Sequence, residues 1–455
     1  MSEKSSSLKL PPVFGIVDDD DSSHRLAKER IAFWETELAV GRWFDDHGYS
    51  LYVRPNEQGL YISEFDHFTP ISCPSSSCPA TTFEHDVYPY AYHSEHRSDH
   101  LPTDWRKREN SEFRLDAKDT TGNILYAQDA SGRHLAFKVA RTDSAEVRIA
   151  HLLKDLGPEG ARENGLLPIL DVLPVDDVFS FIVMPRWGDL HLVESLCKTY
   201  DDVVPVIRNF LKALAFLHHH RIIHRDIQPR NTLVNHFTYA PLQRVLARSV
   251  RLKHRRQLQC VIMDFNISII APPSADLRSY RLPYTTSFAG AYLQPPDVHQ
   301  GEFEYNPFAF DVAAMGILLC CEFQHMSRKV PILAPLLDWM TTRDISRRCT
   351  AAEALAFFDQ LVAEHPVSRE RILSEHYEST GMGFERYNRW EGLPEDFVKK
   401  WSKYRKPPVP RGVLMLRWLY MRDRFSVIPR VRWFFSRAYC WTFGTCFGWL
   451  QRLWG

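Results

Sequence analysis

The polar turn between a predicted helix at 201–220 and a predicted short strand at 232–234 carries the side chains best suited to chemistry. Asp226 and Asn231 stand five residues apart in this turn, within the run HRDIQPRN. The carboxylate can accept a proton from an attacking hydroxyl, and the asparagine can reach a metal ion beside phosphate groups. This spacing suits phosphoryl transfer.

Charged residues also stand in or beside three further stretches of apolar residues. Lys138 lies inside the predicted strand His134 to Val139, and Glu146 opens the helical stretch after it. Taken alone, the lysine is best interpreted as an edge-strand charge. A buried lysine, however, needs an anionic partner, which Glu146 can supply. Asp264 directly follows the third apolar run, Cys260 to Met263.

In chain order, these stretches resemble the motifs of eukaryotic protein kinases. His224 to Asn231 is similar to the catalytic loop H-R-D-x-x-x-x-N, Leu135 to Val139 to the strand V-A-I-K, and Asp264 to Asn266 to D-F-G. The resemblance covers roughly residues 113–360. It implies an α+β, bilobal protein kinase-like fold, with a small five-stranded antiparallel N-lobe and a mainly helical C-lobe.

The resemblance also implies ATP as phosphate donor, Mg²⁺ as its metal ion and a protein as acceptor. Asp226 would accept the proton of a protein hydroxyl, with Lys138 and Arg230 supplying positive charge for catalysis. Asn231 and Asp264 would bind the magnesium. Nucleotide contacts would come from the strand lysine and its partner, the glycine-rich loop and the hinge, at Lys138, Glu146, Gly122, Met184 and Arg186.

Three later stretches distinguish protein kinases from small-molecule phosphotransferases, a class that they disfavour here. Tyr292 to Asp297 resembles the close of an activation loop, Asp311 to Leu319 the central helix of the C-lobe, and Asp344 to Leu355 the run D-P-x-x-R-P-T-A-x-E-A-L. The resemblance implies that Arg348 pairs with Asp297. It also implies that Asp311 bonds the backbone of the catalytic loop.

The chain departs from the family pattern at three places. Only Gly122 survives of the glycine-rich loop, Asn266 replaces the glycine of D-F-G, and Gln228 stands where serine/threonine kinases have lysine. Two interpretations follow. The chain is either an active kinase that prefers serine or threonine to tyrosine, or a pseudokinase that serves as a scaffold. The retained lysine, glutamate, aspartates and asparagine favour activity.

Activation-loop control is a further implication of the resemblance. Arg225, beside the catalytic aspartate, would pair with a phosphate on that loop and so order it. The candidate hydroxyls belong to four consecutive residues, Tyr284, Thr285, Thr286 and Ser287.

The sequence predicts four divisions: an N-terminal extension at 1–110, the N-lobe at 111–186, the C-lobe at 187–362 and a basic, aromatic-rich tail at 363–455. The extension is expected to start disordered, to form one amphipathic helix over about 24–40 and to end in an irregular linker. Trp43 to Tyr52 is expected to form a turn and a strand. Phe113 to Leu115 is the expected first strand of the N-lobe.

Charge is balanced overall but uneven along the chain. From Lys399 onward there are thirteen Lys and Arg against one acid, Asp423. The aromatic residues among these arginines indicate either a brace packed on the kinase domain or a segment lying in an anionic membrane surface. The basic run at 244–256 is better explained as a solvated loop, so nucleic-acid binding is not expected.

The nine cysteines form no complete zinc-binding pattern, and their odd count favours reduced thiols. A cytoplasmic location is therefore expected, with a nuclear one left open. The sequence makes no prediction of oligomeric state.

Overall fold

The computed structural model describes residues 8–15, 23–52, 71–72, 88–94, 116–117, 121–189, 200–238, 259–287, 291–300, 302–365, 383–422, 427–431 and 434. The chain divides into two compact units. Unit 1 comprises Met1–Leu196 with Thr232–Asn266, and unit 2 comprises Cys197–Asn231 with Ile267–Gly455.

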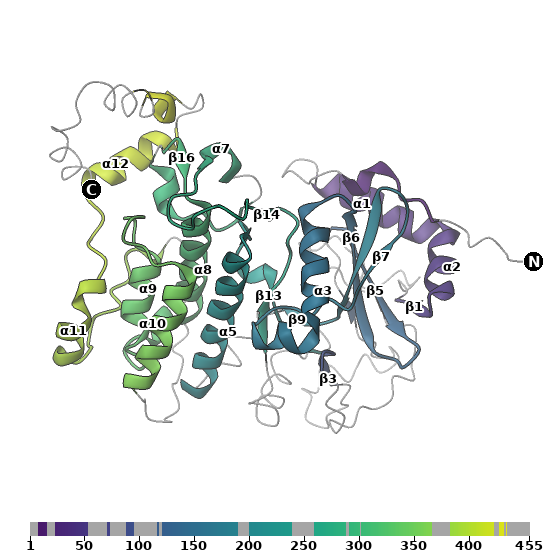
Figure 1. Cartoon of the computed structure of the whole chain (residues 1–455), viewed down its shortest axis with the longest axis horizontal. Helices are drawn as coiled ribbons and strands as arrows, with labels where there is room; N and C mark the ends of the chain where they lie inside the picture. Colours follow the sequence, from purple (N-terminus) through teal and green to yellow (C-terminus); the bar gives the residue numbers. More distant parts are fainter. Residues whose placement is uncertain are drawn as a thin grey trace, which may run out of the picture. The chain divides into compact units, whose positions relative to one another are not determined.

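Unit 1 contains the predicted five-stranded antiparallel sheet (Figure 1). Its strand order is β1-β5-β6-β8-β7, and all of its pairs are antiparallel. The strands are β1 (Tyr49–Leu51), β5 (Ile124–Asp129), β6 (His134–Arg141), β7 (Asp171–Pro174) and β8 (Phe179–Pro185). Valine, isoleucine and aromatic residues suit these pleated, buried positions.

The edge strand β1 comes from the N-terminal extension, where Tyr49 lies opposite Asp129 and Leu51 opposite Ala127. The expected first strand at Phe113 to Leu115 lies outside the described residues. The extension thus supplies a strand to a sheet that was predicted to begin at residue 111. Pairing between segments so far apart depends on packing and leaves no local trace in the sequence.

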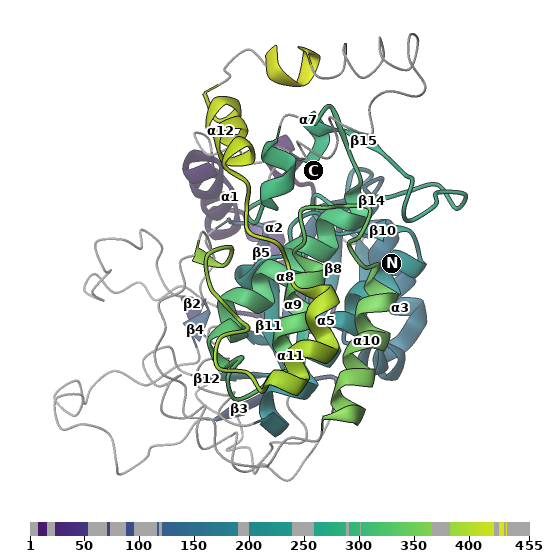
Figure 2. The same ribbon diagram turned by 90° about the vertical axis from the view of Figure 1, so that its left-hand side faces the viewer.

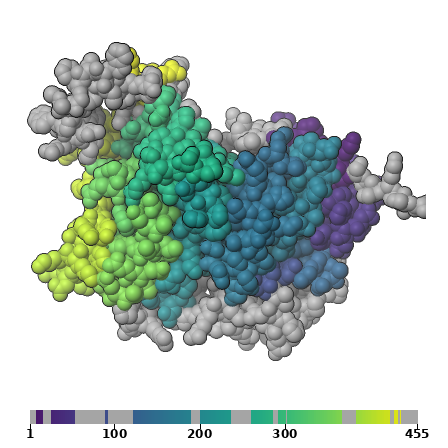
Figure 3. All heavy atoms as spheres, viewed as in Figure 1, coloured from purple at the N-terminus to yellow at the C-terminus, as the bar shows by residue number. Residues whose placement is uncertain are grey.

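One face of the sheet is covered by the extension. Alternate residues of a strand point to opposite faces, and here Leu125, Phe137 and Phe181 point to the covered face. Against them pack η1 (Pro12–Gly15), α1 (Ser23–Thr36) and α2 (Leu38–Asp46), as the purple elements and spheres in Figures 1 and 3 show. The N-terminal extension is therefore part of the hydrophobic core of unit 1.

Two details of the extension differ from expectation. The start was expected to be disordered, but Leu8 and Phe14 are buried in this core. One helix was expected over about 24–40, but two form, because Glu37 ends the first and its side chain accepts a bond from the Ala39 N–H at the start of the second.

The opposite face of the sheet carries Lys138, Ile182 and Met184 toward α3 (Ala145–Glu163). The Ser144 side chain caps α3 by accepting a bond from the Val147 N–H at 3.2 Å. Small sheets complete unit 1, in the orders β13-β11-β9, β12-β3 and β2-β4. Their strands are β2 (Ile71–Ser72), β3 (Tyr92–Ser94), β4 (Asp116–Ala117), β9 (Gly188–Asp189), β11 (Thr232–Val234), β12 (His236–Thr238) and β13 (Cys260–Ile262).

Unit 2 is mainly helical. Its longer helices are α5 (Tyr200–His219), α8 (Pro307–Phe323), α9 (Leu333–Met340), α10 (Ala351–Glu364), α11 (Glu395–Trp401) and α12 (Arg411–Tyr420), with a short α7 (Tyr284–Ser287). The described residues of unit 2 also form the 3-10 turns η4 (Pro229–Asn231), η6 (Pro296–His299), η7 (Gln324–Met326) and η9 (Ser402–Tyr404). Short strand pairs in this described part are β10 (Ile222–Ile223) with β14 (Ile269–Ile270), and β15 (Leu282–Pro283) with β16 (Glu304–Tyr305).

The central helix α8 is apolar on all sides. With η7 it spans Pro307–Met326 and has the length and composition of a membrane-crossing helix, but 83% of its most apolar window is buried inside the protein. A helix that is hydrophobic all round and enclosed by others is a core helix. This burial explains its composition.

The described part of the tail before α12 packs, within unit 2, on α9 and η7. Arg389 is 3% exposed, and its guanidinium donates to Asp338 at 2.7 Å and to Gln324 at 3.0 Å. The Trp390 ring nitrogen donates to the other oxygen of Asp338 at 2.7 Å. This segment therefore braces the helices of unit 2. Most of the last forty residues, for which brace and membrane were both considered, lie outside the described residues.

Candidate functional site

Unit 1 brings three of the predicted site residues together. The Lys138 Nζ lies 2.5 Å from Glu146 Oε1 and 2.5 Å from Asp264 Oδ1. Lys138 comes from β6, Glu146 from the first turn of α3, and Asp264 from the segment after β13. The lysine is thus held between two carboxyl groups.

The electrostatics of this cluster keep the lysine charged. Burial alone lowers the pKa of Lys138, but attraction to Asp264 and Glu146 outweighs burial and raises the pKa above its ordinary value. Burial raises the pKa of Glu146, whereas the nearby Lys138 ammonium acts in the opposite direction. A charged lysine at this position can attract phosphate oxygens.

Asp264 is held by an unusual backbone conformation. Its φ is 70°, in the left-handed region, which costs a residue other than glycine about 1 kcal/mol. The Asn266 N–H donates to Asp264 Oδ1 at 3.2 Å, and the Phe265 N–H bonds the carboxylate of Glu146. The D-F-N turn therefore links the strand lysine to the helix glutamate.

A small apolar cavity lies beside Lys138. Its volume is about 40 Å³, and Met184, Met263 and Phe265 are among its lining residues. Pockets for drug-sized ligands are roughly 300–1,000 Å³, so this space alone is too small for a purine. Met184, predicted to contact nucleotide, thus lines an apolar recess on the same side of the sheet as the lysine.

Arg186, also predicted to contact nucleotide, turns its side chain into unit 1. Its guanidinium donates to the Tyr52 hydroxyl at 2.7 Å and lies over the rings of Tyr52 and Tyr126. The Tyr52 hydroxyl also bonds His134 Nδ1 through a short contact. Any nucleotide contact of Arg186 would have to use its backbone. Sequence reasoning missed Tyr52 and His134 because they lie 82 positions apart.

Gly122 has a packing role. Its φ is 70°, and a Cβ there would lie 2.6 Å from the Arg30 Cβ of α1. Its carbonyl accepts a bond from the Trp34 ring nitrogen at 2.7 Å. Only glycine allows this approach of α1. Its predicted contact with the nucleotide stays a prediction.

In unit 2, the carboxylate of Asp226 accepts hydrogen bonds from uncharged donors. Its Oδ2 accepts bonds from Gln228 Nε2 and Asn231 Nδ2, both at 2.7 Å, and its Oδ1 accepts one from the Tyr292 N–H at 3.0 Å. Asn231 Nδ2 also reaches the Asp226 carbonyl at 2.9 Å, so its amide oxygen faces elsewhere. Arg230 is exposed in η4. Sequence reasoning did not predict the Gln228 and Tyr292 contacts.

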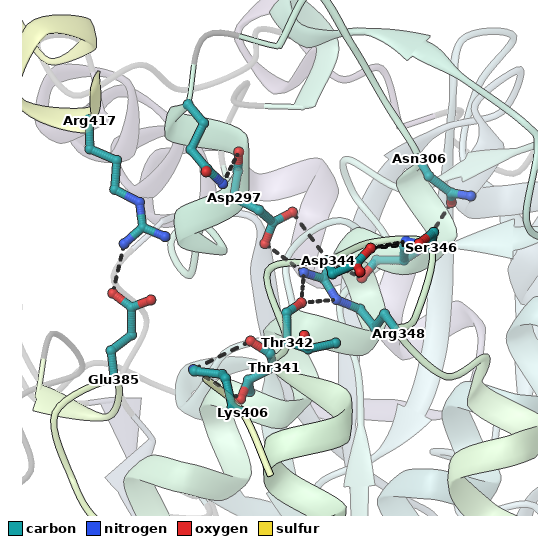
Figure 4. A network of polar contacts seen from close by, with 12 residues as sticks. Asp297, Asn306, Thr341, Thr342, Asp344, Ser346, Arg348, Glu385, Lys406 and Arg417 are labelled. Atoms are coloured by element: carbon teal, nitrogen blue, oxygen red, sulfur yellow. Dashed lines mark hydrogen bonds and ion pairs between the residues drawn. The ribbon is translucent and has the colours of Figure 1, made fainter. Parts of the chain in front are cut away.

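Two structural predictions about the helical core are confirmed. Asp311, fully buried, accepts bonds from the backbone N–H groups of His224 at 2.7 Å and Arg225 at 2.8 Å. Figure 4 shows the second, in which Arg348 Nη2 bonds Asp297 Oδ1 at 2.7 Å, close to the carbonyl of Thr342. Within unit 2, these buried contacts hold the catalytic loop to Asp311 of α8, and hold the turn that carries Asp297 to Arg348.

Arg225 contacts the activation segment through carbonyl groups. Its Nη1 donates to the Ile267 carbonyl at 3.0 Å, and its Nη2 donates to the Thr286 carbonyl through a short contact. Arg225 is 9% exposed. Arg225 therefore ties Ile267 and Thr286 to the catalytic loop through their backbone carbonyls. These carbonyls bond the guanidinium group that was predicted to pair with a phosphate.

A magnesium ion would find suitable chemistry in the predicted ligands. Mg²⁺ prefers oxygen ligands and usually binds through one or two carboxylates together with substrate phosphates. Asp264 in unit 1 supplies a carboxylate, and Asn231 in unit 2, whose Nδ2 donates to Asp226, has its amide oxygen as the atom that could bind a cation. The described residues contain no group of three His, Cys, Asp or Glu that could hold a metal by itself.

The predicted site residues are thus divided between the units. Lys138, Glu146 and Asp264 belong to unit 1, whereas Asp226 and Asn231 belong to unit 2. The chain passes from unit 2 to unit 1 directly after Asn231, and returns directly after Asn266. Convergence of all five side chains on one nucleotide stays a prediction.

Comparison with known proteins points to one family, although no family model matches the chain. The chain is 25% identical over 240 residues to a ribosomal protein S6 kinase alpha-2 of Caenorhabditis elegans, covering 48% of this chain and 28% of that protein. It is 24% identical over 217 residues to a casein kinase II subunit alpha homolog of Encephalitozoon cuniculi, covering 44% and 59%. It is 26% identical over 114 residues to a serine/threonine-protein kinase stk11 homolog of Dictyostelium discoideum, covering 25% and 15%.

The chain spans less than two thirds of the length of each of these relatives. The similarity nevertheless falls on proteins of one kind, and the five-stranded antiparallel sheet of unit 1 and the helices of unit 2 are compatible with a kinase fold. The motifs, their order along the chain and these relatives together identify the chain as a divergent protein kinase-like protein.

Proposed function

We propose that this chain is an ATP-dependent protein phosphotransferase, which transfers the γ-phosphate of ATP to a protein hydroxyl. The observation that carries the proposal is the pair of 2.5 Å contacts from Lys138 to Glu146 and Asp264. A charged lysine held in this way is what phosphate binding needs. A purely structural strand would gain little from a largely buried lysine with two carboxyl groups, since burying charges costs free energy.

The proposed roles follow from the chemistry of each side chain. Lys138 would attract phosphate oxygens, with Glu146 fixing its position. Asp226 would orient a protein hydroxyl and accept its proton. Asn231 and Asp264 would hold Mg²⁺, which supplies charge neutralisation for the phosphates. Arg230, exposed within the catalytic loop, would supply the positive charge that Gln228 lacks.

A protein substrate, and serine or threonine in preference to tyrosine, is the proposed specificity. The names of the relatives support it, since one names casein, one a ribosomal protein, and one a serine/threonine-protein kinase. An arrayed peptide library containing all three hydroxyl types would measure this preference directly. Phosphotransfer confined to tyrosine peptides would contradict it.

A scaffolding pseudokinase is the second candidate, and one observation favours it. Both carboxylate oxygens of Asp226 already accept bonds from the chain, from Gln228, Asn231 and the Tyr292 N–H. A carboxylate has about four acceptor positions, so a substrate hydroxyl would have to share Asp226 with these three donors. A protein in which these donors keep Asp226 to themselves would bind partners without transferring phosphate.

Radiolabel transfer from ATP to a generic protein substrate separates the two candidates. Asp226→Asn removes the proposed base with little change in shape, and Asp359→Asn is a matched control, because Asp359 forms an exposed ion pair with Arg208. The kinase proposal expects transfer by the wild type and the control but not by Asp226→Asn. A thermal shift with Mg-ATP and no transfer would favour the scaffold.

A further inference from the structure

The helix α12 presents an apolar face that the described structure leaves exposed. Its exposed large side chains include Trp418, 54% exposed, together with Leu414, Met415 and Leu419, and the C-cap residue Met421 is 78% exposed. With 3.6 residues per turn, these five side chains lie on one side of the helix. Buried Val413 lies on the opposite side. An exposed apolar face of this kind on a protein surface marks an interaction site.

The opposite side of α12 is anchored to unit 2. Val413 is 3% exposed, and Arg417 Nη1 lies 2.9 Å from Glu385 Oε2, as Figure 4 shows. The Tyr420 ring centroid lies 6.0 Å from that of His299. Within unit 2, α12 lies away from α10 and α11 (Figure 2). The helix is therefore held in a fixed orientation, with its apolar face directed outward.

Positive charge accompanies this face. Arg411 and Arg422 fall on the same side of the helix as Trp418, and the Arg422 guanidinium lies 3.8 Å from the Trp418 ring centroid. From Lys399 onward the chain has thirteen Lys and Arg and one acid. An apolar helix face with flanking arginines and tryptophan is the pattern of helices that lie in anionic membrane interfaces.

We propose that α12 docks this protein on an anionic lipid surface. Its exposed side chains would enter the headgroup region, and its arginines would face anionic headgroups. A second copy of the chain is a poorer occupant, because a symmetric pairing of this face would set arginines against arginines. Val431 and Phe434, which follow α12 in the chain, are also exposed apolar side chains. The proposal does not depend on phosphotransfer activity.

Vesicle co-sedimentation of the full chain tests the proposal. Vesicles of phosphatidylcholine with phosphatidylserine should bind the wild type, and vesicles of phosphatidylcholine alone should bind it much less. The variant Leu414→Glu/Trp418→Glu should bind anionic vesicles on the order of tenfold less tightly, since it puts charge into the apolar face. The control Leu38→Glu alters a side chain 76% exposed on α2 and should leave binding unchanged.

A charge variant isolates the electrostatic part. Arg411→Glu/Arg422→Glu keeps the apolar side chains and should lose the preference for anionic vesicles. Circular dichroism and thermal melts check that each variant is folded. No binding of the wild type to anionic vesicles would overturn the proposal. So would unchanged binding of the Leu414→Glu/Trp418→Glu variant, or light scattering showing a dimer that this variant abolishes.

Discussion

The two units hold their key carboxylates in different ways. In unit 1, Asp264 and Glu146 share one ammonium, that of Lys138, so opposite charges are in contact. In unit 2, Asp226 is surrounded by neutral donors, from two side-chain amides and one backbone N–H. Removing one member of a buried charged set leaves an uncompensated charge, whereas removing one neutral donor leaves two others. The units should therefore respond differently to substitution.

The largest expected effect comes from removing the shared cation. Lys138→Met should lower the free energy of unfolding by about 3 to 5 kcal/mol, because two carboxylates are left side by side without a positive charge. Denaturant unfolding measures it. The double variant Lys138→Met/Glu146→Gln should recover part of the loss. If Lys138→Met is as stable as the wild type, water must already screen the charges of Lys138, Glu146 and Asp264. The proposed difference between the charged contacts of unit 1 and the neutral contacts of unit 2 would then be wrong.

The anchor of the catalytic loop should give the next largest effect. Asp311→Asn keeps one acceptor but loses the charge that binds two backbone N–H groups, so we expect a loss of about 2 kcal/mol. Asp359→Asn removes an exposed carboxylate and should lower the free energy of unfolding by less than about 1 kcal/mol. Denaturant unfolding measures the free energy of unfolding of both variants. Similar losses in the two variants would show that the burial of Asp311 contributes little to stability.

Alkaline pH should act on unit 2 through Tyr305. Burial raises the pKa of Tyr305 from 10.0 to about 12, so the folded state holds this proton where the unfolded state releases it. The stabilising contribution is thus complete below pH 10 and is lost as pH rises toward 12, on the order of 2 kcal/mol. Tyr305→Phe should remove this part of the pH dependence of unfolding. An unchanged alkaline profile would contradict the assignment.

The smallest expected effect on stability comes from the neutral donors. Gln228→Lys should change the free energy of unfolding by less than about 1 kcal/mol, because the new ammonium still bonds Asp226. In the proposed kinase, this charge should raise phosphotransfer by roughly threefold or more. Gln228→Glu is the opposite control, since it sets a second anion against Asp226 and should lower transfer. Equal activity of all three proteins would mean that residue 228 does not influence the reaction.

Local sequence reasoning succeeded where a pattern lies within a few residues. The apolar runs at 134–139 and 260–263 predicted β6 and β13, and the broad apolar face at 201–220 predicted α5. The contacts of Asp311 and of Arg348 with Asp297 followed from the family resemblance and are confirmed. The roles assigned to the site residues stay predictions.

Other features depend on segments that meet only in the folded chain. The sequence located Lys138, Glu146, Asp264, Asp226 and Asn231, because alternation in strands, helical periodicity and turn chemistry are properties of neighbouring residues. The tertiary structure alone decided that β1 joins the sheet from the extension, that α1 covers Gly122 and that Tyr52 holds Arg186. These contacts are set by shape and burial between distant segments, such as the 134 positions that separate Tyr52 from Arg186, and no local pattern encodes them.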